Sequence, residues 1–323
     1  MSYFYEFYCV VCTKQGQLPQ GRQPYFVQKL IFHLKTYFTM RKPTFLLAVL
    51  ALLSFVACKQ NTSTDNTKEE AEEEAAANPL AGAWKMTAWK PADSEGQVAP
   101  DVVQYKFYTD SHFFFVGYDD KADTVAQAGG GTYTVDDGTF TEKIAFASWD
   151  SPNVGTSYTF DFTAGEDGNT FKQRGVMKSN VEGEPDFQLA EDYVKVGPAL
   201  EPAVAEKAPV GLWKITKSLY GDQEEATAPA DSMVIHKLIT PTHFYVVTYN
   251  KNTGKLDGMT FGTYEMKDGK YVETVMATTR SIELIDKMLP FEYEYTGDSF
   301  TQKGVMEFTD GPFELQEYYT RVE

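Results

Sequence analysis

Two glutamates and two glutamines recur at matching places along the chain, on short segments that alternate apolar and polar residues. Glu142 lies within FTEKI and Glu273 within YVETV, and each glutamate shares one strand face with an apolar residue on either side. Gln173 and Gln302 each lie within F-x-Q-x-G-V-M, on the face that also holds the phenylalanine and the methionine. A few polar groups among apolar walls are the usual composition of a small-molecule pocket.

The closing segment of each half adds a second polar set. Glu191 shares a face with Tyr193, and Glu317 shares one with Tyr319. Eight residues are therefore our candidate ligand-binding positions: Glu142, Gln173, Glu191, Tyr193, Glu273, Gln302, Glu317 and Tyr319. Two other interpretations stay open, a closed polar network that needs no ligand and a strand twist that turns these side chains to solvent.

Catalytic and metal-binding patterns are missing from the sequence. It holds no Ser/His/Asp order, no phosphate-binding glycine loop and no His/carboxylate metal spacing. His112 and His243 occupy matching positions beside phenylalanines, which favours packing or turn chemistry. We expect no catalytic residue, no cofactor and no metal. The remaining catalytic alternative is an isomerase or hydrolase that uses Glu142 or Glu273 inside the fold.

The three cysteines are Cys9, Cys12 and Cys58, so the chain beyond residue 58 holds no disulfide and no cysteine-based metal site. Cys9 and Cys12 have the spacing of half a zinc ribbon, but no second pair completes four ligands.

The charge balance excludes one class of partner. The chain has 46 acidic residues against 29 lysines and arginines, a formal net charge of −17. Such a surface repels phosphates and anionic headgroups, so we expect neither nucleic-acid binding nor membrane adhesion through a basic patch.

The N-terminal region has the features of an export signal. Basic residues after Met40 precede thirteen uncharged residues, FLLAVLALLSFVA, which end at Ala57, directly before Cys58. This run fits a signal-peptide core and is shorter than the ~20 residues that cross a bilayer. Its end resembles the lipobox of bacterial lipoproteins, with Phe55 where leucine is usual. The resemblance implies a signal peptide over 40–57, lipidation of Cys58 and a place in the cell envelope, in the outer membrane, with 1–39 upstream of the true start.

Residues 58–78 form a polar, acidic stretch with almost no apolar residue larger than alanine. Such a segment buries too little surface to fold, and its like charges extend it. We expect it to be a disordered tether between the lipid and the globular part.

The rest of the chain repeats itself. Residues 79–197 match residues 209–323 in five blocks that occur in the same order, among them G-x-W-K, G-T-Y and F-x-Q-x-G-V-M. The intervening 198–208 is a linker rich in Pro, Ala and Glu. We therefore predict two tandem domains.

Each repeat reads as a series of short strands. Turn signals separate about eight alternating segments per copy, and aromatic residues make up 15% of the chain. This pattern predicts an all-β fold with two tandem antiparallel barrels of about eight strands each, with a two-sheet sandwich as the competitor. One segment, RSIELIDKM over 280–288, has helical periodicity.

A resemblance follows from the ends of each repeat. The Gly-x-Trp at its start and the basic residue in its last segment resemble the lipocalins and the wider calycin superfamily, and each copy is similar to lipocalin-like domains of uncharacterised bacterial lipoproteins. The resemblance implies that Trp84 packs against Lys195, and Trp213 against Arg321, to close each barrel.

Three functions remain open on this basis. The first is an envelope lipoprotein whose barrels bind a small hydrophobic or amphipathic ligand or a partner, and it requires a cavity of at least ~300 Å³. The second is a structural or interaction protein with filled barrels. The third is the intrabarrel enzyme, which we weigh least.

Overall fold

The computed structural model describes residues 78–90, 95–148, 153–197 and 207–323. The predicted signal peptide, Cys58, nearly all of the tether and most of the linker lie outside these ranges. Among the residues described, there is no helix with the length and apolarity that crossing a membrane requires.

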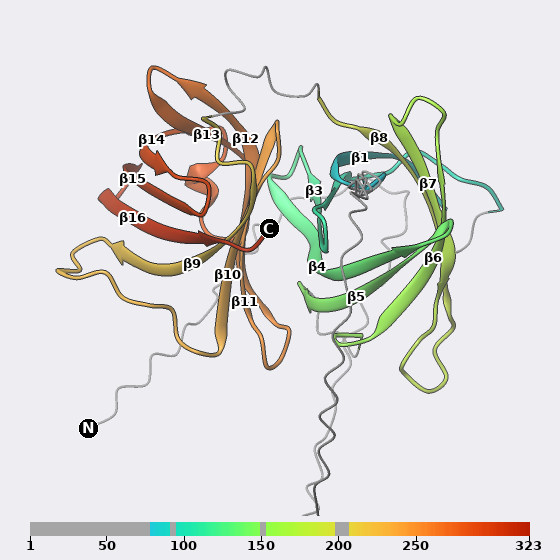
Figure 1. The fold of residues 1–323 in the computed structure, drawn as a ribbon. Coiled ribbons are helices and arrows are strands. Elements are labelled where there is room, and N and C mark those ends of the chain that lie inside the picture. Colours follow the sequence, from blue (N-terminus) through green and yellow to red (C-terminus); the bar gives the residue numbers. More distant parts are fainter. Residues whose placement is uncertain (1–77, 91–94, 149–152, 198–206) are drawn as a thin grey trace, which may run out of the picture. The chain divides into compact units, whose positions relative to one another are not determined.

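Eight strands close the first barrel, in which every strand pairs antiparallel with its neighbours in sequence and β1 pairs with β8 (Figure 1). They are β1 (Gly82–Trp89), β2 (Val103–Tyr108), β3 (His112–Asp119), β4 (Thr124–Asp136), β5 (Thr139–Ala147), β6 (Ser157–Ala164), β7 (Thr170–Met177) and β8 (Phe187–Lys195).

Eight more strands close the second barrel in the same order, with β9 paired to β16. They are β9 (Gly211–Tyr220), β10 (Met233–Ile239), β11 (His243–Asn250), β12 (Leu256–Lys267), β13 (Lys270–Thr278), β14 (Met288–Tyr295), β15 (Ser299–Phe308) and β16 (Gly311–Arg321). The predicted all-β fold with two tandem barrels is confirmed, and the sandwich alternative is wrong.

The helix expected over 280–288 is wrong. Only a 3₁₀ turn, η1 (Ile282–Leu284), forms there, and β14 begins at Met288. The backbone N–H of Asp286 donates to Val275 of β13 at 2.9 Å, and Ile285 forms a bridge with the same residue. Pairing with β13 therefore overrides the local helical pattern.

Each barrel closes around a tryptophan. Lys195 Nζ lies 5.4 Å from the ring centre of Trp84, and Arg321 Cζ lies 4.3 Å from that of Trp213. Both indole N–H groups donate at 2.7 Å to a backbone carbonyl four residues earlier, at Leu80 and at Pro209. The two ends of each repeat therefore meet at one point, through the same contacts in both copies.

The glycine of Gly-x-Trp leaves room for that cation. Gly82 and Gly211 have φ of +131° and +140°, where side chains are strained. A Cβ at Gly82 would lie 3.2 Å from Lys195 Cε, and one at Gly211 would lie 2.3 Å from Arg321 Nη1. A side chain at Gly211 would force Arg321 to move, and one at Gly82 would crowd Lys195 slightly.

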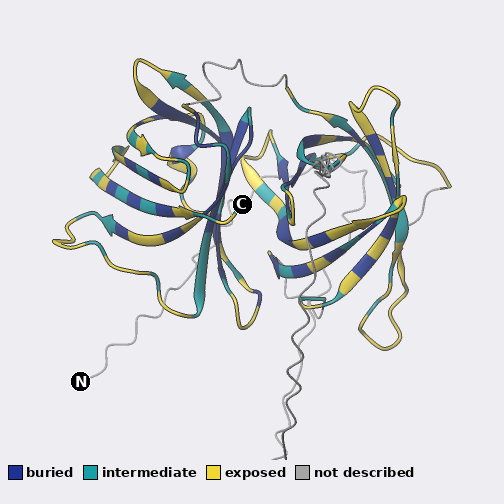
Figure 2. Cartoon of the chain, in the orientation of Figure 1, coloured by how far each residue is buried: buried dark blue, intermediate teal, exposed yellow. Residues whose placement is uncertain are grey.

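Side-chain alternation differs between strands. Figure 2 shows buried residues alternating with less buried ones along β5 and with exposed ones along the first part of β6, as on a sheet with one face in water. In contrast, β2 has five buried residues in a row. Its outward residue Phe107 packs at ring distances of 5.9 Å and 5.6 Å from Tyr245 and Phe261 of the second barrel. Both faces of β2 are therefore buried, one in each hydrophobic cluster.

Candidate functional site

A buried lysine organises the interior of the first barrel. Lys106 of β2 lies with its ammonium 2.9 Å from Glu142 of β5 and 2.9 Å from Oε1 of Gln173 of β7. Lys106 is 5% exposed, Glu142 4% and Gln173 0%. A buried charge is tolerated when it is paired and hydrogen-bonded, and this triad supplies both.

The second barrel repeats this Lys–Glu–Gln triad. Lys237 of β10 donates to Glu273 of β13 and, at 2.5 Å, to Oε1 of Gln302 of β15. Burial raises the pKa of Glu273 as it does that of Glu142, and in each barrel the neighbouring lysine opposes that rise. The two barrels therefore contain the same Lys–Glu–Gln arrangement.

The lysines also fix the orientation of the glutamine amides. An ammonium only donates, so the amide atom beside it must be the oxygen, and the NH₂ group must point elsewhere. Where that NH₂ group goes is the main difference between the two barrels.

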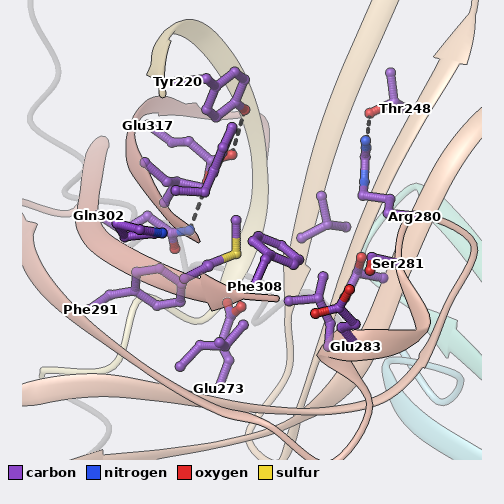
Figure 3. Close-up of a pocket in the computed structure, with 18 of the residues that line it drawn as sticks. Tyr220, Thr248, Glu273, Arg280, Ser281, Glu283, Phe291, Gln302, Phe308 and Glu317 are labelled. Carbon is purple, nitrogen blue, oxygen red and sulfur yellow. Dashed lines mark hydrogen bonds between the residues drawn. The ribbon is translucent and has the colours of Figure 1, made fainter. Parts of the chain in front are cut away.

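In the second barrel the amide finds a carboxylate. Gln302 Nε2 donates at 2.7 Å to Glu317, which also accepts at 2.6 Å from Tyr220 (Figure 3). Glu317 accepts a third bond from Tyr319 at 2.6 Å. Burial, followed by the charge of Glu317, raises the pKa of Tyr319 well above its usual range. Tyr319 therefore stays a proton donor, and the network from Lys237 to Tyr220 is closed.

In the first barrel another glutamine intervenes. Gln104 Nε2 lies 3.0 Å from the Tyr193 hydroxyl and 3.4 Å from Glu191, and Tyr193 donates at 2.7 Å to the other oxygen of Glu191. Gln173 Nε2 is buried and has no hydrogen-bond acceptor among the residues described. The position of Gln104 is held by Ile235 in the second barrel, since the two residues pair with matching positions of β3 and β11.

A cavity of about 1000 Å³ lies against the network of the second barrel. Figure 3 shows Glu273, Gln302 and Glu317 around it, with Phe291 and Phe308 among the apolar side chains. Its apolar walls are Ile235, Phe244, Val246, Leu284, Leu289, Phe291, Met306, Phe308, Phe313 and Leu315.

A cavity of about 560 Å³ occupies the first barrel. Its polar lining includes Gln104, Lys106, Glu142, Gln173 and Glu191, and its apolar lining includes Met86, Trp89, Phe115, Ile144, Tyr158, Phe160, Met177, Phe187 and Leu189. Both cavities thus combine largely apolar walls with a buried polar set, as pockets for small amphipathic molecules do.

Side-chain hydrogen bonds join two connections at one side of each barrel. Glu283 of η1 accepts from the backbone N–H and the hydroxyl of Thr309, each at 2.8 Å, and both residues line the cavity. In the first barrel, Asn180 donates to Asn153 at 3.1 Å and to Thr156 at 2.8 Å. The β5–β6 connection is thereby tied to the β7–β8 connection, and β13–β14 to β15–β16.

The comparisons with known proteins name no activity. Residues 79–203 match the family model described as domain of unknown function DUF4488. No curated protein matches the chain.

Among solved structures, the uncharacterized protein YLR301w from Saccharomyces cerevisiae matches with 14% identity and a TM-score of 0.43, over 74% of this chain and 99% of its own. A protein of unknown function from the DUF3598 family of Nostoc punctiforme matches with 10% identity and a TM-score of 0.22, over 76% of this chain and 97% of its own.

The structure brings the eight candidate residues together inside their barrels. Six of them line a cavity: Glu142, Gln173, Glu191, Glu273, Gln302 and Glu317. Tyr193 and Tyr319 lie one hydrogen bond away, on Glu191 and Glu317. The sequence left a polar network and a ligand cavity as alternatives, and in the structure the two occur together inside each barrel.

His112 and His243 lie away from the cavities. His112 Nδ1 is 2.7 Å from Glu323 Oε1, and His243 Nδ1 is 2.7 Å from the hydroxyl of Thr242. Within the described part of the chain, no group of three or more His, Cys, Asp or Glu side chains is placed to hold a metal ion.

Sequence reasoning missed the two lysines and Gln104. A usable signal was present, because Lys106 and Lys237 occupy matching places in Y-K-F and H-K-L, between bulky neighbours. A lysine repeated within a strand that is otherwise so rich in bulky residues requires a buried acid, and the repeated glutamates on β5 and β13 are those acids.

Proposed function

We propose that this chain is a cell-envelope lipoprotein whose two lipocalin-like barrels bind small hydrophobic or amphipathic molecules. The observation that carries the proposal is the pair of interior cavities, about 1000 Å³ and about 560 Å³. Both exceed the ~300 Å³ at the lower end of ligand pockets. Filled barrels would have no such space, so the cavities favour binding over the purely structural alternative.

The lining argues for ligands that are mainly apolar. Aromatic and aliphatic side chains form most of each wall, and burying a ligand's apolar surface against them contributes about 25 cal/mol per Å². The Lys–Glu–Gln triads are internally neutralised, so they orient a polar group of the ligand without demanding a charged one.

An intrabarrel enzyme is the second candidate. Glu142 and Glu273 meet one requirement, a carboxylate whose pKa burial raises and which faces a cavity. Each is held by a lysine at ion-pair distance, which favours the charged form and occupies an oxygen. We therefore propose binding without catalysis and no cofactor.

Anchoring through Cys58 is part of the same proposal and is supported by the lipobox-like sequence that precedes it. A lipid on Cys58 and the acidic stretch after it would hold the barrels near a membrane that supplies hydrophobic molecules. The proposed site of action is the outer membrane, with no nucleic-acid partner.

Native mass spectrometry of the full chain, isolated from its own envelope in mild detergent, tests both parts. We expect a covalent mass increase from acylation at Cys58 and a further, dissociable mass from a bound small molecule. Cys58→Ser should remove the covalent increase alone. A chain of unmodified mass would reject the anchor, and a chain that carries no dissociable mass would contradict the binding proposal.

A further inference from the structure

We infer that the first barrel selects a neutral, largely apolar molecule that carries a carbonyl group, such as a ketone, ester or amide, through the N–H groups of Gln173 and Trp89. The inference rests on the proposed binding function and deepens it by assigning a ligand class to one cavity. It follows from two N–H donors at that cavity that have no partner among the described residues, beside the similarly unpartnered hydroxyl of Tyr158, and from the charges around them.

The first donor is the amide of Gln173. Lys106 occupies its oxygen at 2.9 Å, which leaves the NH₂ group without an acceptor among the described residues, in a side chain that is 0% exposed. A buried donor without a partner loses its hydration and gains nothing in return. Native structures keep few such groups, and one beside a cavity points to a partner that the cavity admits.

The second donor is the indole N–H of Trp89. It is also buried without a hydrogen-bond partner in the described chain, and Trp89 lines the same cavity as Gln173. Its backbone is held on both sides, by Glu191 of β8 and by a bridge to Val98. An indole N–H and an amide NH₂ group only donate, so the N–H groups of Trp89 and Gln173 both require an acceptor on the ligand.

Charge decides which acceptor fits. Glu142 and Glu191 line this cavity, and the one lysine among its lining residues, Lys106, is already neutralised by Glu142 at 2.9 Å. An anionic head group would face Glu191 without a free cation in the described lining. A cationic head group could pair with Glu191 or Asp101, but it carries no acceptor for the two N–H groups. A neutral carbonyl is the remaining acceptor that suits the two N–H groups.

The cavity wall includes side chains that can adjust to a ligand. Met86 and Met177 line the cavity, and unbranched thioether chains change rotamer readily. A carbonyl oxygen could then reach Gln173 Nε2, as Glu317 reaches Gln302 Nε2 in the second barrel at 2.7 Å.

The second barrel provides a natural control. Ile235 replaces Gln104 there, Glu317 takes the glutamine amide, and Ser218 stands where the first barrel has Trp89, since both pair with the corresponding glutamates. Gln104→Ile should release Glu191 to accept from Gln173, which removes one free donor. Trp89→Phe keeps an aromatic ring and removes the other.

The test uses the full chain held in amphipol, with Leu315→Trp to narrow the second cavity and weaken binding there, and two probes that differ in one group. Butyrophenone has a carbonyl where butylbenzene has a methylene. Calorimetric titration measures both affinities, and infrared spectroscopy of ¹³C=O-labelled butyrophenone reports whether the carbonyl is hydrogen-bonded.

We expect butyrophenone to bind with a lowered carbonyl stretching frequency. Gln104→Ile and Trp89→Phe should each weaken it about five- to tenfold and leave butylbenzene unchanged. Thermal unfolding confirms that each variant is folded. If both probes bind, but the carbonyl band is unshifted and neither variant changes the ratio of affinities, the carbonyl assignment is overturned and the binding function stands. If neither probe binds, the binding function fails for this cavity.

Discussion

The interiors of the two barrels start from the same triad and end differently. Lys106 and Lys237 each hold a glutamate and a glutamine. Beyond the glutamine, the second barrel closes its network on Glu317, whereas the first leaves an amide donor without a partner among the described residues. Each lysine can be buried because the glutamate and glutamine of its triad pair with it. The residues around the triad differ between the barrels, and they determine which ligands each cavity accepts.

The residues that pair with these polar positions also determine the size of each cavity. Trp89, Tyr158 and Phe115 of the first barrel pair with Glu191, Glu142 and Lys106. The corresponding partners in the second barrel are the smaller Ser218, Leu289 and Val246. Bulkier side chains on an identical frame explain the volume of about 560 Å³ against about 1000 Å³.

The largest effect should come from the shared triad. Lys237→Met leaves Glu273 buried without a cation, and removing one partner of a buried ion pair costs about 3–5 kcal/mol. Lys106→Met should lower the free energy of unfolding by a similar amount, measured by urea denaturation.

Matched variants sharpen that result. Lys270→Met, at an exposed position of β13, should change stability little, and Lys237→Met combined with Glu273→Leu should recover most of the loss. A loss below about 1 kcal/mol in either single variant would show that its triad is not a structural requirement.

A smaller effect should distinguish His243 from its counterpart His112. Burial lowers the pKa of His243 to about 4, from 6.5. Below pH 6.5 this histidine is protonated in the unfolded chain but stays neutral in the native chain until the pH approaches 4. The free energy of unfolding therefore falls as the pH drops from 6.5 towards 4. At 1.36 kcal/mol per pKa unit, the loss between pH 7 and pH 5 is about 2 kcal/mol from this residue.

His243→Gln should reduce the pH dependence of unfolding over that range by about 2 kcal/mol, while His236, whose pKa burial lowers to about 3, keeps its own contribution. His112, half-buried and bonded to Glu323, is the matched site at which the same substitution controls for the change of side chain. Equal slopes in the wild-type chain and in His243→Gln would contradict the assignment.

The sequence predicted the repeat, the strands and most of the interior polar set, because alternation is clear where one strand face is buried and the other meets water. It failed at β2 and β10, whose outer faces pack in the apolar cluster shared by the two barrels. With both faces buried, period-two alternation disappears and Lys106 and Lys237 look like isolated charges.

Two further features depend on contacts that no local pattern carries. The segment around η1 was predicted to be helical, but its backbone pairs with β13. The unpaired donor of Gln173 follows from Gln104, a residue 69 positions earlier in the chain whose hydrogen bonds occupy Glu191 and Tyr193. Which side chain pairs with Glu191 depends on how the strands are aligned in the folded barrel.

Titration of the full chain in amphipol with N-phenyl-1-naphthylamine, whose fluorescence rises in apolar surroundings, tests the central claim most directly. Leu189 and Leu315 line the two cavities at corresponding positions, and exposed Val305 serves as a control for the added indole. We predict two bound probes, with the same affinities, in the wild-type chain and in Val305→Trp, weaker binding at the narrowed cavity in Leu189→Trp or Leu315→Trp, and weaker binding at both in the double variant. Unchanged binding in the double variant would contradict the claim that the barrels bind ligands in their interiors.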